Sequence, residues 1–241
     1  MCAVALSHGL PPASAPARGE LHLLLVDLRE AAASERGLRG FLSRDEIERA
    51  ARFQAEGARS RFVLTRGWLR VILARCLNAT PERLTFSYGA NGKPALAEEW
   101  RRSELFFNVS HSGDYALIGL TSGRAIGVDI EQVRPMPDFA EIASGYFSET
   151  EMRAIEAFPE ADRLRGFFRC WTRKEAFMKA TGDGMAIALD AFSVTLDDDA
   201  EPGVSISDSR LPHGDAWCVK GLSLLPECEI NRDSCSKPQK Y

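Results

Sequence analysis

The hydrophobic pattern of the chain changes period several times, and each change predicts a different kind of element. Leu and Val dominate residues 21–28 without polar alternation, which predicts a buried first strand. Apolar residues recur at intervals of three and four over residues 58–78 and again over 164–180, which predicts two long amphipathic helices. One of these helices falls in each half of the chain.

Shorter segments around these helices predict strands and further helix starts. Brief apolar runs separated by glycine or proline predict strands over residues 84–86, 105–109, 115–120, 125–133, 192–196, 216–220 and 222–225. Two pairs with capping-box spacing predict the starts of two more helices: Ser43 with Glu46, and Ser148 with Glu151.

Helices followed by a small sheet occur in both halves, which predicts an α+β fold. Two lobes are expected to meet near residue 122, an N-terminal lobe of residues 1–122 and a C-terminal lobe of residues 123–241. Ala, Pro and Ser dominate residues 1–20, and Pro, Ser and Lys are frequent in 226–241, so a flexible arm and a flexible tail are expected. No residue-level repeat accompanies the two halves, and the pattern alone does not prove a duplication.

Composition narrows the class of protein. A chain of 241 residues with 45% hydrophobic and 27% charged residues is typical of a globular protein and excludes disorder, collagen and coiled coil. The net charge of −4 makes nucleic acid an unexpected partner. No apolar run reaches membrane length, and the N-terminus lacks the features of a signal peptide. The six cysteines include no C-x-x-C pair, which indicates a cytoplasmic protein whose Cys76 and Cys170 are core thiols.

The sharpest chemical signal is the segment Gly127-Val128-Asp129-Ile130-Glu131. On a strand, Asp129 and Glu131 share one face while the two apolar residues share the other. Adjacent carboxylates repel each other, so a cation is expected between them, and Mg²⁺ prefers carboxylate and phosphate oxygens. A solvated strand face is the alternative, because D-x-E alone is a weak signal.

A second signal lies near the end of the helix predicted over residues 164–180. Glu175 and Lys179 are four residues apart and share a helix face, and the loop Gly182-Asp183-Gly184 follows. An exposed ion pair would explain this spacing. A helix that ends in a glycine loop can also place Glu175 beside a metal and Lys179 beside a phosphate, so both interpretations stay open.

Three further segments contain side chains that can bind an anion such as a phosphate. Ser110 and His111 follow an apolar strand, where hydroxyl and imidazole groups can donate hydrogen bonds, although a structural histidine is the simpler interpretation. Lys93 lies in the turn Asn91-Gly92-Lys93-Pro94 and can clamp a phosphate. Arg61, on the basic side of the helix predicted over 58–78, can do so from another direction.

The order of these segments resembles that of the 4′-phosphopantetheinyl transferases, most closely the branch that activates surfactin synthetase and similar megasynthases. The pairing of W-x-x-K-E-x-x-x-K with G-x-D-x-E is the specific part of the match. Within residues 40–200, the matching segments are G-K-P at 92–94, F-N-V-S-H-S at 107–112, G-V-D-I-E at 127–131, F-S-E-T-E at 147–151 and W-T-R-K-E-A-F-M-K-A at 171–180.

The resemblance implies a reaction and a fold. Coenzyme A binds with Mg²⁺, a serine of an acyl or peptidyl carrier protein attacks its β-phosphate, and 3′,5′-ADP leaves. The implied fold is a pseudo-twofold pair of similar α/β lobes in one monomeric chain, with coenzyme A in the cleft between them and the carrier docked beside it. Mn²⁺ accepts the same oxygen ligands as Mg²⁺.

The resemblance also implies a role for each candidate residue. Asp129, Glu131 and Glu175 would hold the metal. Glu175 would take the serine proton, directly or through a water, and Lys179 would stabilise the pyrophosphate as a point charge. The remaining roles are those of coenzyme A binding, with the nucleotide phosphates held by Ser110 and His111 and the 3′-phosphate end held by Lys93 and Arg61.

Two other functions remain open at the level of sequence. A non-catalytic module that binds coenzyme A or a carrier protein would share many of these residues, although simple binding does not require three metal ligands. Another Mg²⁺-dependent nucleotide phosphotransferase is the third option, but neither a P-loop nor a kinase signature occurs. Fatty-acid, polyketide and non-ribosomal peptide carriers all present a similar serine, so the sequence does not select among them.

Overall fold

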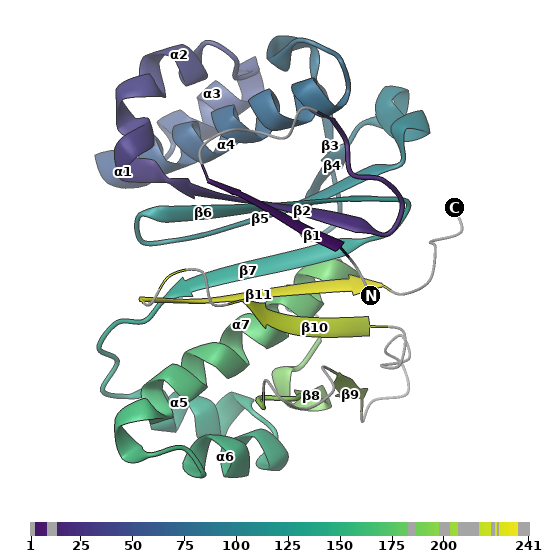
Figure 1. The fold of residues 1–241 in the computed structure, drawn as a ribbon. Coiled ribbons are helices and arrows are strands. Elements are labelled where there is room, and N and C mark those ends of the chain that lie inside the picture. The colour runs from purple at the N-terminus through teal and green to yellow at the C-terminus, as the bar shows by residue number, and fades with distance from the viewer. Residues whose placement is uncertain are drawn as a thin grey trace.

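Two β-sheets lie face to face across the middle of the molecule, and helices cover the outer side of each sheet (Figure 1). The computed structural model describes residues 3–8, 14–182, 187–197, 203–206, 217–222, 225 and 227–235. Helices and strands are mixed along the chain, so the predicted α+β class is confirmed.

The first sheet has the strand order β1-β2-β6-β5, with β1 parallel to β2 and the other neighbours antiparallel. Its strands are β1 (Ala3–His8), β2 (Glu20–Asp27), β5 (Leu105–Ser112) and β6 (Tyr115–Ser122). The helices on its outer side are α1 (Leu28–Ala31), α2 (Glu35–Arg39), α3 (Arg44–Ala51) and α4 (Glu56–Cys76). A hairpin of β3 (Phe86–Tyr88) and β4 (Pro94–Leu96) precedes β5.

The second sheet is antiparallel with the order β10-β11-β7. Its strands are β7 (Ile126–Gln132), β10 (Trp217–Leu222) and β11 (Cys228–Cys235). On its outer side lie α5 (Phe139–Tyr146), α6 (Glu149–Glu156), α7 (Arg163–Thr181) and the hairpin of β8 (Phe192–Val194) and β9 (Val204–Ile206). Short 3-10 turns lie at Ala32–Ser34, Pro81–Arg83, Glu98–Ser103, Glu160–Asp162 and Leu189–Ala191.

The two sheets pack on each other through their apolar faces. Leu23 and Leu117 from the first sheet and Val128 and Ile130 from β7 belong to one cluster and are completely buried. Burial of each such side chain contributes about 1.5–3 kcal/mol to folding. Because side chains alternate along a strand, Asp129 and Glu131 face the opposite way, toward α7.

Gly127 lets α7 approach β7 closely. A Cβ atom at this position would lie 1.9 Å from the carbonyl oxygen of Ala176 and 2.5 Å from the amide nitrogen of Ala180. Both distances are far below van der Waals contact, so any larger residue would push the helix away from the strand. The glycine of the G-V-D-I-E segment therefore brings the end of α7, with Glu175 and Lys179, against the strand that carries Asp129.

The long helices lie where the hydrophobic period predicts them. α4 covers most of the helix predicted over 58–78, and α7 includes the whole of 164–180. Both predicted capping boxes are present, at Ser43 with Glu46 and at Ser148 with Glu151. Cys170 is fully buried as predicted, and Cys76 is half-buried. In the described part of the chain, no helix combines the length and the apolar content that a membrane crossing requires.

Several predictions for short segments need correction. β3 begins at Phe86, where the sequence predicts a strand that ends there. β10 covers 217–222, where the sequence predicts a strand over 216–220. The strand predicted over 222–225 includes residues 223 and 224, which, like residue 216, lie outside the described residues. Short apolar runs define neither end of a strand, because strand ends depend on the partner strand.

The predicted arm and tail also contain strands. Ala3–His8, within the predicted flexible arm of residues 1–20, forms β1 beside β2. Cys228–Cys235, within the predicted tail of 226–241, forms β11 between β10 and β7. Cys228 and Ile230 enter the core between the sheets, so a two-residue alternation hidden in a polar segment is enough for a central strand. Residues 1–2, 9–13, 226 and 236–241 lie outside the described residues.

Candidate active site

Three segments meet at Asp129 on the α7 side of β7. Its Oδ1 accepts a hydrogen bond from Ser110 Oγ of β5 at 2.6 Å and one from Lys179 Nζ of α7 at 2.5 Å. Lys179 Nζ also lies 2.9 Å from Ser110 Oγ. The structure therefore brings together one residue from each of the three strongest sequence signals.

The other carboxylate oxygen of Asp129 has no hydrogen-bond partner. Asp129 is 3% exposed, and its Oδ2 is buried. A buried acceptor without a donor costs about 1–3 kcal/mol, and more when it is charged. Such an oxygen suits a hard cation, which would supply the missing positive charge.

Glu131 lies two residues further along β7 and is held in a similar way. Its Oε2 accepts a hydrogen bond from Ser112 Oγ at 2.6 Å and lies 3.5 Å from Arg134 Nη1. The Ser112 hydroxyl in turn accepts a hydrogen bond from the amide of Gln132 at 3.1 Å. Ser112 was given no role from the sequence, although it lies two residues after Ser110 and therefore on the same face of β5.

Glu175, on α7, interacts electrostatically with the same two carboxylates. Burial raises the pKa of Glu175, and the negative charges of Asp129 and Glu131 raise it further, while Lys179 opposes both effects. Burial likewise raises the pKa of Glu131, and Asp129 adds to this rise against the hydrogen bond from Ser112. The three carboxylates therefore interact electrostatically in one partly desolvated region.

The carboxylates lie close enough to affect one another but do not form a closed metal cage. In the part of the chain that the structure describes, no group of three His, Cys, Asp or Glu side chains is arranged to hold a metal ion. Lys179 and the hydroxyls of Ser110 and Ser112 donate hydrogen bonds to carboxylate oxygens that would otherwise be available to a metal. The donor set still fits a divalent cation, since it consists of oxygen ligands and includes the unpartnered Oδ2 of Asp129.

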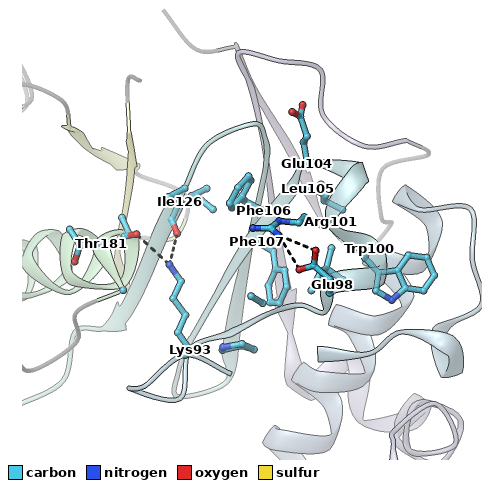
Figure 2. A pocket seen from close by; sticks show the side chains of 17 residues that line it. Lys93, Glu98, Trp100, Arg101, Glu104, Leu105, Phe106, Phe107, Ile126 and Thr181 are labelled. Carbon is cyan, nitrogen blue, oxygen red and sulfur yellow. Dashed lines mark hydrogen bonds and ion pairs between the residues drawn. The ribbon is translucent and has the colours of Figure 1, made fainter. Parts of the chain in front are cut away.

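Lys93 extends from the β3–β4 hairpin to the end of α7. Its ammonium donates to the carbonyl oxygen of Lys179 and lies 3.4 Å from the carbonyl oxygens of Ile126 and Ala180. Figure 2 shows this side chain in a pocket of about 400 Å³, pointing toward the start of β7 and the end of α7. Burial, together with the charge of Lys179, lowers the pKa of Lys93 to about 8. The ammonium of Lys93 is therefore already bonded to main-chain carbonyl oxygens at the end of α7 and the start of β7.

His111 faces a second, basic pocket. This pocket of about 200 Å³ lies between β5 and α4 and is also lined by Arg49, Phe62 and Arg66. Desolvation lowers the pKa of His111, and the positive charges of Lys179 and Arg61 lower it further. The positive charge of Arg61 therefore acts on the imidazole.

Arg66 is a further candidate that sequence reasoning left without a role. It is 8% exposed, and its Nη1 is buried without a hydrogen-bond partner. Its Nε lies 3.5 Å from Glu46 Oε1, and burial lowers the pKa of its guanidinium. The sequence signal for Arg66 was its place on the basic side of α4, but burial, which makes it distinctive, depends on the packing of α3 against α4.

Other charged residues of the motifs are structural. Lys174, which precedes Glu175 in the W-T-R-K-E block, is fully buried, and its Nζ lies 2.8 Å from Glu151 Oε1. Glu151 also completes the capping box of α6, so this pair ties α6 to α7. Asp183 and Gly184 of the predicted glycine loop lie outside the described residues.

Comparison with known proteins gives two adjoining family matches. The profile of the "4'-phosphopantetheinyl transferase superfamily" matches residues 125–226. A profile described as "4'-phosphopantetheinyl transferase, N-terminal" matches residues 36–122. Together the two matches include every strand and helix that contributes to the Asp129 cluster.

Individual relatives carry the same name. The chain is 36% identical over 217 residues to the 4'-phosphopantetheinyl transferase HetI of Nostoc sp. (strain PCC 7120), a match that covers 90% of this chain and 87% of the relative. It is 31% identical over 172 residues to the 4'-phosphopantetheinyl transferase Sfp of Bacillus subtilis, covering 71% and 74%. It is 37% identical over 146 residues to AcpT of Salmonella typhimurium, covering 60% and 70%.

Proposed function

Since the chain belongs to the 4′-phosphopantetheinyl transferase superfamily, we propose which of its side chains carry out that reaction. The enzyme transfers the 4′-phosphopantetheine group of coenzyme A to a serine of a carrier protein and releases 3′,5′-ADP. Phosphoryl transfer depends mainly on positioning and on neutralisation of charge, not on a covalent enzyme intermediate.

Asp129, Glu131 and Glu175 are the proposed ligands of the divalent cation. The unpartnered Oδ2 of Asp129 supports this set, as do the raised pKa values of Glu131 and Glu175, which burial raises first and the negative charge of Asp129 raises further. When bound, Mg²⁺ would supply positive charge that neutralises the negative charge developing on the pyrophosphate. Mn²⁺ has the same preference for oxygen ligands.

Lys179 is the proposed pyrophosphate-binding residue. Its ammonium already lies among Asp129 and Ser110, so a small rotation of a flexible side chain would carry it to a phosphate oxygen nearby. The Ser110 hydroxyl has a single proton, which it donates to Asp129, so it would have to rotate to donate to a nucleotide phosphate together with His111. The ion pair with Asp129 would thus hold Lys179 in place until coenzyme A arrives.

Glu175 is the proposed acceptor of the carrier serine proton. Burial and neighbouring carboxylates raise its pKa, which makes it a better proton acceptor than an exposed glutamate. A carboxylate that also binds a metal is a weak base, so transfer through one intervening water is the more favourable route. The proton leaves the serine Oγ as that oxygen bonds to phosphorus.

The basic pocket beside His111 is the proposed site of the 3′-phosphate. Arg61 acts on His111 electrostatically, and Arg66 brings a buried N–H without a partner. Arg49 lines the same pocket. Lys93 was expected here from the sequence, but its role in phosphate binding stays a prediction, since carbonyl oxygens hold its ammonium.

The assembly state, the location and the division into lobes remain predictions from the sequence. These are a monomeric enzyme, a cytoplasmic location, and an N-terminal lobe of residues 1–122 beside a C-terminal lobe of residues 123–241. The observation that carries the proposal is the meeting of Asp129, Ser110 and Lys179 beside an unpartnered carboxylate oxygen.

Mass spectrometry of a panel of apo-carriers tests the proposal. Fatty-acid, polyketide and peptide carriers are incubated with enzyme, coenzyme A and Mg²⁺, and at least one should gain the mass of phosphopantetheine. A chelator should abolish the gain, and restored Mg²⁺ or Mn²⁺ should recover it. Modification that continues unchanged in the chelator would contradict the metal assignment, and calorimetric binding of coenzyme A without any product would favour a non-catalytic module.

A further inference from the structure

β11 places two polar residues directly opposite the two carboxylates of β7. In the antiparallel register, Asn231 pairs with Asp129 and Glu229 pairs with Glu131. Side chains of directly opposed residues lie on the same face of a sheet, about 4.5–5.5 Å apart at Cβ. Asn231 and Glu229 therefore face α7, as Asp129 and Glu131 do.

Asn231 is bonded to two adjacent residues of α7. Its side chain is completely buried, its Oδ1 accepts a hydrogen bond from Arg173 Nε at 3.2 Å, and its Nδ2 donates to Thr172 Oγ1. Thr172 is also completely buried, and Arg173 is 3% exposed. One carboxamide thus uses both its donor and its acceptor to hold one turn of the helix.

Glu229 holds the preceding two turns of the same helix. Its Oε1 accepts a hydrogen bond from Arg165 Nη1 at 2.9 Å, and its Oε2 lies 3.6 Å from Arg169 Nε. Arg165, Arg169 and Arg173 are four residues apart, so they form a single stripe along α7. We call Glu229 and Asn231 with their partners on α7 the β11 clamp.

The clamp acts on the same helix that carries Glu175 and Lys179. A helix advances about 1.5 Å and turns about 100° per residue, so a shift of one position in the clamp would carry both residues away from Asp129. Close packing at Gly127 sets how near α7 lies to β7. Replacing buried polar pairs with apolar residues is often neutral or stabilising, so stability alone does not explain these bonds. Their directionality further constrains the rotation and the height of α7.

We propose that the β11 clamp is a positioning device for the active site, in which Asn231 and Glu229 act through α7 to set Glu175 and Lys179 against the carboxylates of β7. The proposal rests on the function proposed above. It assigns a role to a strand that lies beyond the matched family region of residues 125–226.

Matched variants separate positioning from general stability. Asn231→Ala removes both bonds, and Thr172→Val keeps the shape of its side chain but removes the hydroxyl that accepts from Asn231. Thr172→Ser keeps that hydroxyl, and Ile230→Val removes a methylene from a completely buried residue on the opposite face of β11. Thermal unfolding of each variant identifies the temperature at which all are folded.

The clamp predicts a change in kcat that the controls do not share. Asn231→Ala and Thr172→Val should lower kcat roughly 10–100-fold, the scale of a misplacement near 1 Å, with KM for the carrier changed by less than about twofold. Thr172→Ser and Ile230→Val should retain kcat within about threefold of wild type. If Asn231→Ala does not fold, Thr172→Val and Glu229→Gln carry the test.

Calorimetric titration with Mn²⁺ in the presence of coenzyme A gives a second readout. Asn231→Ala or Thr172→Val should bind Mn²⁺ about tenfold more weakly, because a shifted α7 would carry Glu175 away from the carboxylates of β7, while Ile230→Val binds as wild type does. Wild-type kcat and Mn²⁺ affinity in the clamp variants would overturn the positioning role. Failure of the wild-type enzyme to bind Mn²⁺ would instead contradict the proposed metal site.

Discussion

The ammonium of Lys179, on α7, lies 2.5 Å from Oδ1 of Asp129, on β7. Asp129 is buried, and its second oxygen has no hydrogen-bond partner, so Lys179 supplies the positive charge closest to this carboxylate. A metal ion and Lys179 would therefore compete for the same carboxylate. Variants that remove Lys179 but keep Asp129 can therefore separate phosphate binding from metal binding.

Lys179→Met should lose turnover without losing metal binding. Removal of one preorganised charge from a phosphoryl-transfer site is expected to lower kcat by about 10²–10³. Because the variant leaves Asp129 without its ion pair, Mn²⁺ affinity measured by calorimetry without coenzyme A should equal or exceed that of wild type. Lys220→Met, which removes an exposed lysine on β10, is the matched control. Loss of Mn²⁺ binding in Lys179→Met would show that the lysine does not compete with the metal.

Ser112→Ala should weaken metal binding while leaving the chemical step nearly intact. Its hydroxyl orients Glu131 at 2.6 Å and touches none of the proposed substrate groups in the described structure. Loss of such a partner typically lowers metal affinity about 10–100-fold. Because Glu131 is partly exposed, we expect a loss of about tenfold. The measurement is the Mg²⁺ concentration for half-maximal rate, with kcat at saturating Mg²⁺ as the comparison. An unchanged half-saturation would mean that Glu131 needs no orienting hydroxyl.

Arg61→Ala and Arg66→Met should weaken binding of the 3′-phosphate specifically. A hydrogen bond to a charged group contributes about 1.5–3 kcal/mol, so KM for coenzyme A should rise about tenfold or more. The same variants should leave KM for 3′-dephospho-coenzyme A unchanged, since that substrate lacks the phosphate. Arg44→Ala, at an exposed arginine paired with Glu48, should change neither value. An equal rise in KM for both substrates would place the 3′-phosphate elsewhere.

Lys93 should make stability depend on pH in a defined window. Its pKa is lowered from 10.5 to about 8 in the folded enzyme, so the folded state binds the proton less tightly than the unfolded chain does. Below pH 8 both states are protonated and the cost of burying the charge is present in full. As pH rises from 8 toward 10.5, the folded state releases its proton first and that cost disappears.

The comparison is between wild type and Lys93→Met by chemical denaturation at several pH values. The free energy of unfolding of wild type should rise relative to that of the variant across this window. A difference that stays flat or falls with pH would mean that burial does not destabilise the charged form of Lys93.

Local patterns predicted the parts of the fold that depend on neighbours in sequence. The helical period gave α4 and α7, and strand alternation correctly separated Asp129 from the core residue Val128. Two capping boxes were visible as four-residue patterns. The family motifs then placed the candidate residues on elements that do meet in space.

Features that depend on distant partners could not be predicted in this way. β11 is central because Cys228 and Ile230 fill the core between the sheets, yet its composition resembles that of a flexible tail. Lys93 meets carbonyl oxygens of β7 and α7, which no local pattern near residue 93 indicates. Ser112 gained its role only when β5 was placed beside β7, opposite Glu131.

The central claim is that carboxylates from β7 and α7 share one catalytic cation. Electron paramagnetic resonance of Mn²⁺ in the presence of coenzyme A tests it on wild type, Asp129→Asn and Glu175→Gln, with Glu149→Gln as a control at an exposed ion pair. Wild type and the control should bind a single Mn²⁺ per chain, and each of the two site variants should lose that binding while remaining folded. Undiminished Mn²⁺ binding in both site variants would contradict the claim.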